Sequence, residues 1–228
     1  MIISHKHKFI FFRTHKTAST SIEIALSGIC GQKDVITQIS KADEKERVRL
    51  GITTSQNINV PLLNYSLQDF CHSFFQKKKK KYERHMSAKE IKATVSKNIW
   101  NSYFKFSIER NPYDRMVSLY YWKGGDEKFK TIYQFLTDSR LTCFDSFEKY
   151  SIDKKIAVNQ IYQYEDLEFF LKDLSLKICL KNPLQLPNYK AKSHTRKIRD
   201  YKKVLDDKSK EWIEERYANV IDRFGYEW

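Results

Sequence analysis

The chain has 228 residues, of which 41% are hydrophobic and 31% charged, a composition typical of a globular protein with a full core. It contains no run near the roughly 20 apolar residues that cross a bilayer, and its start, MIISHKHKFIFF, lacks the apolar region and cleavage site of a signal peptide. We therefore expect a soluble, cytoplasmic protein. The net charge of +14 favours partners such as nucleic acid, anionic glycans or a phosphate-rich cofactor.

Apolar runs and period-2 patterns predict strands and helices that alternate from the first residues onward. A strand over Lys8–Thr14 leads into a helix over Ser19–Gly28. Residues 33–64 read as irregular apart from a short strand near Val35–Ile39. Two helices follow, near Leu67–Phe75 and over Ala88–Ser96.

The second half of the chain repeats this alternation. The predicted elements are a strand over Tyr103–Glu109, a helix opened by Pro112, helices near Ile132–Thr137 and Cys143–Tyr150, a strand over Ala157–Tyr164, a helix from Glu165, a polar loop over residues 181–207 and a final helix over Lys208–Phe224. Such alternation predicts an α/β fold, a single domain over residues 1–228 with a central, mainly parallel sheet flanked by helices.

The four cysteines, at positions 30, 71, 143 and 179, are widely scattered. No CxxC pair and no Cys/His ligand spacing is present, so we expect free thiols and no metal site.

The stretch FIFFRTHKTASTSIEIAL, Phe9–Leu26, predicts a strand, a tight turn and a helix. The first N–H groups of a helix have no intrahelical partner and lie at its positive end, so a phosphate or sulfate group is the natural ligand. Lys16 adds a charge, and the hydroxyls that follow add donors. A Walker A loop has its lysine after glycines, whereas Lys16 precedes the small residues and no glycine lies in the turn, which argues against a kinase or ATPase. An ordinary Ser/Thr-capped helix is the alternative.

A second strand–turn–helix pattern lies in FSIERNPYDRMVSLYYW, Phe106–Trp122. Arg110 ends the strand, and Ser118 lies on the second helical turn. Both can point to the carboxyl edge of the sheet, where open α/β folds bind ligands. An arginine fork with a hydroxyl suits a terminal phosphate. Pairing of Arg110 with a carboxylate such as Asp114 is the alternative.

Together these motifs resemble the sulfotransferase superfamily, above all the carbohydrate sulfotransferases that include heparan sulfate 2-O-sulfotransferase, and their soluble bacterial relatives. HKTASTS resembles the family's loop for the 5′-phosphosulfate, and RNPYDRMVSLYY its 3′-phosphate motif. The segments HMSAKEIK (His85–Lys92), YQYEDL (Tyr162–Leu167) and IDRFGYEW (Ile221–Trp228) also fit, whereas residues 33–80 are poorly covered. The resemblance implies a fold like that of the P-loop NTPases.

The resemblance further implies 3′-phosphoadenosine 5′-phosphosulfate (PAPS) as donor, 3′-phosphoadenosine 5′-phosphate (PAP) as product, no metal, and in-line transfer of the sulfuryl group to a hydroxyl or amine. Lys16 would stabilise the leaving charge, while Arg110 and Ser118 would hold the 3′-phosphate. The 5′-phosphate would lie in the cradle formed by Thr17, Ala18, Ser19, Thr20 and Ser21. Arg13 either reaches the donor or covers the sheet edge. A late basic loop would close over the donor, with Lys192, Thr195, Arg196 and Lys197 as candidates.

The acceptor proton needs a base, and a neutral histidine suits this task near pH 7. His85 is our choice, because it heads the segment that resembles the family's base-bearing region. His15, next to Lys16, is the rival. Glu109 is a third candidate, with a buried, paired carboxylate as the alternative reading.

The acceptor class is less defined than the donor. The run Lys77–Lys81, with Arg84, precedes His85 and would favour an anionic acceptor such as an acidic glycan, unless it is only a solvated surface. A basic nucleic-acid-binding protein is the competing class, yet no helix-turn-helix, RNP motif or zinc spacing supports it, so no nucleic acid is expected. A P-loop-like nucleotide kinase is the other competitor, and the absent glycines argue against it.

Overall fold

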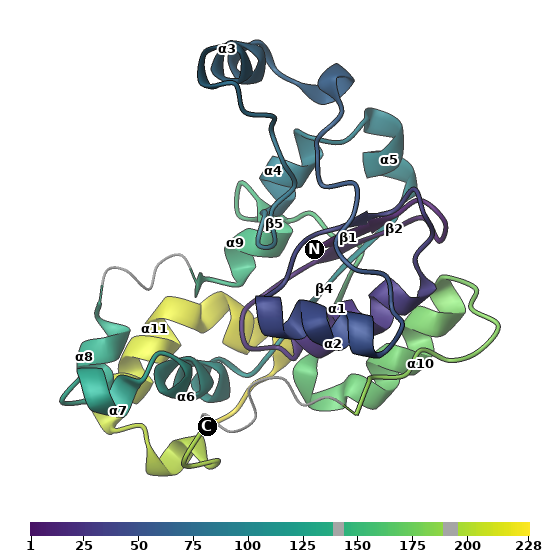
Figure 1. Cartoon of the computed structure of the whole chain (residues 1–228). Helices are drawn as coiled ribbons and strands as arrows, with labels where there is room; N and C mark the ends of the chain where they lie inside the picture. Colours follow the sequence, from purple (N-terminus) through teal and green to yellow (C-terminus); the bar gives the residue numbers. More distant parts are fainter. Residues whose placement is uncertain (139–143, 189–195) are drawn as a thin grey trace.

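The structure is a computed structural model that describes residues 1–138, 144–188 and 196–228 (Figure 1). A five-stranded sheet lies at its centre in the order β3-β1-β2-β4-β7. The strands are β1 (Ile2–Ser4), β2 (Phe9–Phe12), β3 (Val35–Ile36), β4 (Phe104–Glu109) and β7 (Gln160–Gln163).

The sheet is mixed, which corrects the expectation of a mainly parallel sheet. β2, β4 and β7 run parallel, whereas β1 is antiparallel to both β2 and β3. Only four residues join β1 to β2, too few for a parallel crossover. β1 itself was not predicted, because three residues are too short to give a periodic signal. The expectation of parallel strands is correct for β2, β4 and β7.

One face of the sheet is covered by two helices, α1 (Ser19–Ile29) and α10 (Leu167–Lys177). Phe9 and Phe11 alternate along β2 and point to this face, where Phe11 stacks on Phe106 of β4 and Phe9 meets the same ring at a tilt. Ile22 of α1 and Phe170 of α10 are fully buried in the same cluster. Burial of this apolar surface stabilises the strand–helix layers that position the ends of the strands.

The intervening residues of β2 point to the other face. Ile10 and Phe12 pack against Met86 and Ile91, which belong to a segment that includes α4 (Ala88–Lys92). Trp100, on α5 (Lys97–Ser102), meets Phe12 edge-on with ring centroids 6.3 Å apart.

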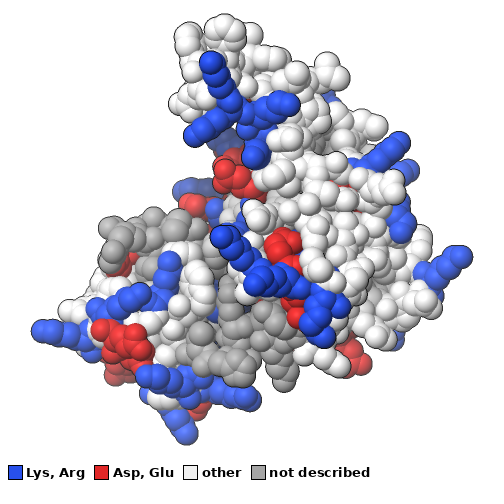
Figure 2. Space-filling view, viewed as in Figure 1, with Lys and Arg blue, Asp and Glu red and all other residues white. Residues whose placement is uncertain are grey.

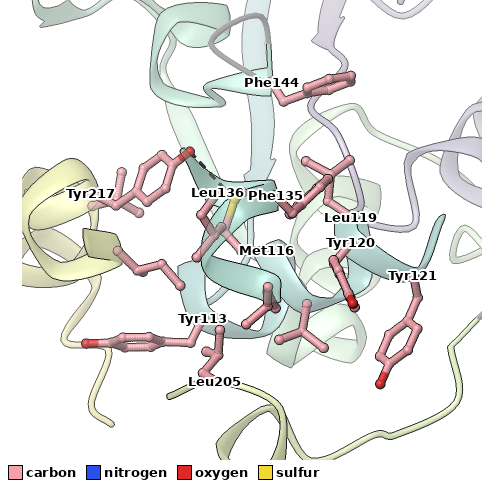
Figure 3. Close-up of a cluster of buried hydrophobic side chains, with 14 of the residues drawn as sticks. Tyr113, Met116, Leu119, Tyr120, Tyr121, Phe135, Leu136, Phe144, Leu205 and Tyr217 are labelled. Atoms are coloured by element: carbon pink, nitrogen blue, oxygen red, sulfur yellow. Dashed lines mark hydrogen bonds between the residues drawn. The ribbon is translucent and has the colours of Figure 1, made fainter. Parts of the chain in front are cut away.

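A separate apolar cluster joins α6 (Pro112–Trp122), α8 (Ile132–Leu136) and α11 (Asp207–Phe224), as Figure 3 shows. Tyr120 of α6 meets Phe135 of α8 edge-on at 5.3 Å. α11 bends at Tyr217, whose hydroxyl donates to Met116 Sδ at 3.7 Å. This cluster holds α6, and with it the second motif, in place.

Helix α2 (Lys41–Arg49) lies in the stretch that was expected to be irregular. It has no apolar stripe: its buried residues are Asp43 and Arg47. Ser40 caps its N-terminus, and Arg47 pairs with Glu44 at 2.9 Å. Polar contacts hold this helix in place, so hydrophobic periodicity could not reveal it.

Three other boundaries differ from the prediction. The helix expected over Ala88–Ser96 ends at Lys92 as α4, and Ser96 caps a further helix, α5, that was not predicted. The helix expected from Cys143 is α9 (Phe147–Tyr150), and Cys143 itself lies outside the described residues. The predicted polar loop over 181–207 contains a short 3₁₀ helix, η4 (Tyr201–Lys203).

The remaining elements are short, apart from α3. They are η1 (Leu62–Asn64), α3 (Leu67–Gln76), α7 (Gly125–Lys128), the hairpin of β5 (Ser151–Ile152) and β6 (Lys155–Ile156), and η3 (Tyr164–Asp166). Within the described part of the chain, none of the helices combines the length and the apolar character that crossing a membrane requires. Cys30, Cys71 and Cys179 carry free thiols.

Candidate active site

The site lies at the edge of the sheet where the three parallel strands end, because parallel strands bring their carboxyl ends together. Residues 13–18 follow β2, and Arg110 follows β4. Thr14 Oγ1 donates to the carbonyl of Ile108 on β4 at 2.5 Å and lies 2.9 Å from Thr17 Oγ1. Thr14 and Thr17 are both fully buried, so the first turn is fixed to the neighbouring strand.

The backbone of this turn adopts an unusual conformation. Lys16 and Ala18 have φ values of 62° and 52°, in the left-handed region, where a side chain costs about 1 kcal/mol or more. Ala18 is the N-cap residue of α1. The residues between the strand and α1 thus follow a tight path without glycine, and backbone conformations of this kind gather at ligand sites. Alternating conformations also turn successive N–H groups toward one anion.

The two motifs meet directly. Arg110 Nη1 donates to the carbonyl oxygen of Lys16 at 2.7 Å. Lys16 Nζ lies 5.5 Å from the ring centroid of Trp122 on α6. Ser118 is one helical turn before Trp122 and therefore shares its face of α6. The structure thus places Lys16 beside Arg110 and beside the face of α6 that carries Ser118.

Arg110 is almost fully buried and is held by several groups. Its Nε donates to Asp114 at 2.7 Å, and its Nη2 donates to the same carboxylate. Its guanidinium lies 4.2 Å from the ring centroid of Tyr164. The alternative pairing with Asp114 is therefore present. These bonds and the one to Lys16 use three of the five N–H donors of a guanidinium, so two remain for a ligand as far as the described residues go.

One of the candidate residues of the late basic loop, Arg196, lies beside Arg110 and Asp114. Arg196 Nη1 pairs with the second oxygen of Asp114 at 2.6 Å, so Asp114 joins two arginines. Lys197 pairs with Asp126 instead. Thr195 and Lys192 lie outside the described residues.

Arg13 takes part in an internal ion pair. It is 5% exposed, and it donates to Glu23 and, at 2.8 Å, to Thr20 Oγ1. Burial would raise the pKa of Glu23, but Arg13 and the Met1 amino group lower it. These contacts tie Arg13 to α1, and they place the hydroxyl of Thr20 against Arg13. Ser19, the neighbouring cradle residue, is also buried.

His15 and His85, the two candidate bases, lie against each other with their rings stacked 3.8 Å apart at 16°. His15 also meets Phe144 edge-on at 4.7 Å. Burial and the nearby Arg13 lower the pKa of His15 from 6.5 to about 3, and burial with the adjacent His15 lowers the pKa of His85 further. Both rings are therefore neutral at pH 7. His85 Nδ1 is buried without a hydrogen-bond partner in the described structure.

Glu109 is a buried carboxylate with several partners. It accepts hydrogen bonds from Ser146 Oγ and Tyr150 OH, both at 2.6 Å, and lies 3.6 Å from Arg115 Nε. Its side chain has no solvent exposure. This is the paired strand-end carboxylate that the sequence offered as the alternative to a base.

Some residues of the site were not singled out by the sequence. Thr14 ties the turn to β4, Trp122 lies beside Lys16, and Tyr164 lies against Arg110. Tyr164 immediately follows β7, so its place at the carboxyl edge of a parallel strand was the available signal.

The sequence profile of the sulfotransferase family matches residues 1–188, and the chain belongs to this family. It is thus an enzyme of the class that transfers sulfate groups. The chain is also 31% identical over 119 residues to an uncharacterized protein of Archaeoglobus fulgidus, covering 50% of this chain and 99% of that protein. No solved structure matches the chain. The family match confirms the predicted superfamily, and the closer likeness to heparan sulfate 2-O-sulfotransferases stays a prediction.

Proposed function

We propose that this chain transfers the sulfuryl group of PAPS to a hydroxyl or amine of an acceptor and releases PAP. The observation that carries the proposal is the hydrogen bond between Arg110 Nη1 and the Lys16 carbonyl, 2.7 Å long. It joins the residues expected at the two ends of the donor in one site. When bound, PAPS supplies an activated sulfuryl group on its 5′-phosphate.

The groups present suit a ligand with two phosphates. The left-handed turn at Lys16 and Ala18 and the first N–H groups of α1 would hold the 5′-phosphate, with Thr17, Ser19, Thr20 and Ser21 lining the turn. The two remaining N–H donors of Arg110 and the Ser118 hydroxyl would hold the 3′-phosphate. Asp114 keeps the Arg110 fork in one orientation, and Arg196, joined to the same carboxylate, adds positive charge.

Lys16 would provide the main electrostatic assistance. Its ammonium group would stabilise the negative charge that develops on the leaving phosphate as the S–O bond breaks. In-line group transfer of this kind depends chiefly on positioning and on charge stabilisation, which a fixed turn supplies without rearrangement.

His85 would accept the proton of the acceptor, with His15 stacked against it. A base works best when its pKa is near the working pH, and the pKa values of both rings lie far lower in the free chain. Arg13 contributes to both shifts through its positive charge. An anionic ligand beside Lys16 would offset this charge and raise the pKa values of the histidines, so the base would become effective when the donor is bound.

The acceptor is proposed to be a carbohydrate or another hydroxyl-bearing molecule, sulfated in the cytoplasm. The net charge of +14 favours an anionic acceptor. Support for a carbohydrate comes from the resemblance of the motifs to carbohydrate sulfotransferases.

Calorimetry with PAP, ATP and 5′-AMP tests the donor. We expect PAP to bind most tightly, and Arg110→Ala to weaken its affinity by about 10- to 100-fold, the usual worth of charged hydrogen bonds, with little change for 5′-AMP. Arg49→Ala is the matched control, because Arg49 pairs with Glu46 on an exposed helix face. Equal affinity for all three nucleotides, or an Arg110→Ala variant with unchanged PAP affinity, would contradict the proposal. A preference for ATP with turnover of ATP would favour a kinase.

A further inference from the structure

Residues 61–81 form a unit that projects from the body of the protein, which we call the α3 arm (Figure 1). Its base is closed by backbone pairing: Val60 N–H donates to the Lys80 carbonyl at 3.0 Å, and Tyr82 N–H donates to the Ile58 carbonyl at 2.7 Å. Within the arm, the Lys80 N–H donates to Tyr65 OH at 2.7 Å. The arm is therefore held by a paired stem and presents α3 away from the core.

The arm exposes a stripe of large apolar side chains. Leu63, Leu67 and Phe74 are 98%, 87% and 81% exposed, and Phe70, which lies between them along the stripe, is 47% exposed. Leu67, Phe70 and Phe74 are spaced by three and four residues, which places them on one side of α3, and Leu63 lies on the preceding η1. Phe75 adds a further ring that is 81% exposed. No residue of α3 is buried.

A helix of this kind needs a cover. Ten residues are too few for a stable helix in water unless an apolar face is packed against something. Apolar patches left on a protein surface mark sites that bind another surface. The α3 arm therefore carries a docking face, and the side chains on and around this face indicate the kind of partner.

The arm is also strongly basic, which indicates the charge of its partner. Lys77–Lys81 follow α3 directly, and the arm holds one acidic residue, Asp69, so its net charge is +4. Asp69 pairs with Lys80 at 2.8 Å. Figure 2 shows basic side chains gathered just below the mostly white surface of the projecting arm. An apolar stripe bordered by lysines suits a surface that is both apolar and anionic.

We propose that the α3 arm binds the surface of an anionic membrane, with the Leu and Phe side chains inserted at the boundary of headgroups and acyl chains and the lysines on anionic headgroups. Short amphipathic helices with adjacent basic clusters bind lipid surfaces through these two contributions together. A second copy of the chain is a poorer partner, since a two-fold contact would place one +4 arm against another. A soluble polyanion would engage the lysines but leave Phe74 and Phe75 in water.

The arm ends close to the candidate base. His85 follows Lys81 by four residues, a span of at most about 14 Å. Attachment through the arm therefore holds this part of the molecule near the bilayer. The proposal rests on the arm alone and does not depend on the identity of the sulfuryl donor.

Flotation with vesicles tests it, using phosphatidylcholine alone and phosphatidylcholine mixed with about one third phosphatidylserine, at several salt concentrations. We expect the intact chain to bind the anionic vesicles, more weakly as salt rises. The double variant Phe74→Ser with Phe75→Ser, and a variant with Lys77–Lys81 changed to Gln, should each lose at least about tenfold in vesicle affinity.

Matched controls distinguish binding through the arm from binding caused by net charge or by exposed apolar residues elsewhere. Phe169→Ser with Leu176→Ser removes two exposed apolar residues of α10, 54% and 71% exposed. A second control removes five exposed lysines elsewhere: Lys33, Lys45, Lys89, Lys172 and Lys181, each changed to Gln. Both controls should keep most of the vesicle affinity, and thermal unfolding should be unchanged for the arm variants.

Three results would overturn the proposal. The first is no binding of the intact chain to anionic vesicles. The second is an equal loss of vesicle affinity when the five control lysines are changed to Gln, which would assign vesicle binding to the net charge of the chain. The third is self-association in light scattering that disappears with the Phe74/Phe75 variant, which would assign the face to a second copy. PAP binding is measured in the same arm variants. If it is unaltered, a failure of the membrane proposal does not count against the proposed sulfuryl donor.

Discussion

The turn between β2 and α1 and the α3 arm differ in how they are held. In the turn, Thr14 and Thr17 are fully buried and bonded, and the carbonyl of Lys16 accepts a bond from Arg110, which follows β4. In the arm, no residue of α3 is buried. The turn therefore depends on the whole fold, whereas the arm's surface depends on its own sequence. Substitutions in the turn should lower turnover or the free energy of unfolding. Substitutions in the arm should change only the binding of vesicles.

Lys16→Ala should show the largest effect. We expect hydrolysis of PAPS to PAP and sulfate to fall by about 10²- to 10³-fold, because the variant loses a preorganised charge at the leaving group. Alanine already adopts the left-handed conformation two residues away, at Ala18. The substitution at Lys16 should therefore not disturb the backbone, and we expect thermal unfolding to change little. Lys33→Ala, an exposed lysine, is the control. Normal turnover in Lys16→Ala would remove Lys16 from the catalytic step.

Glu109→Gln should lower the free energy of unfolding by about 3 kcal/mol, because the buried Arg115 would lose its carboxylate partner. Urea denaturation measures the change, with the exposed Glu215→Gln as control. The observed partners favour a structural role for Glu109. A variant of normal stability that loses turnover would instead make Glu109 the base.

The histidine pair predicts a specific pH dependence of stability. His15 has a pKa of about 3 in the folded chain against an ordinary value of 6.5, and the pKa of His85 is shifted in the same direction. Between these pH values the unfolded chain binds more protons, so the free energy of unfolding falls as the pH is lowered from 6.5 toward 3.

Replacement of the ring should reduce that fall. His15→Gln should lose less stability than the intact chain when urea denaturation is moved from neutral to acidic pH, whereas His72→Gln, an exposed histidine, should follow the intact chain. An identical acid dependence in His15→Gln would show that burial does not shift its titration. NMR titration with PAP bound should show higher pKa values for His15 and His85 than in the free chain.

The smallest effect is expected in the arm. Phe74→Ser with Phe75→Ser should change the free energy of unfolding by less than about 0.5 kcal/mol and leave turnover of soluble donor intact, because both rings are already in water. Urea denaturation and the donor hydrolysis assay measure these quantities. Lost hydrolysis in this variant would mean that the arm belongs to the site, and the contrast between the two regions would disappear.

Local signals were sufficient for both motifs. The small residues after Lys16 and the proline that opens α6 predicted two strand–turn–helix units, and both helices begin where expected, at Ser19 and Pro112. The resemblance placed Lys16 and Arg110 at the two ends of one donor, and in the structure Arg110 donates to the Lys16 carbonyl. Other features were beyond local reasoning: β1 is too short to be periodic, and α2 is held by polar contacts instead of an apolar stripe.

The sequence by itself determined which functional groups the candidate site holds, since the order of charged and hydroxyl residues around Lys16 and Arg110 is local. It also determined the apolar stripe and the lysines of the α3 arm. Only the tertiary structure decided that His15 stacks on His85, 70 residues further along, and that Asp114 joins Arg110 to Arg196. Contacts between distant residues depend on how the helices and strands pack, and that packing is a property of the whole chain.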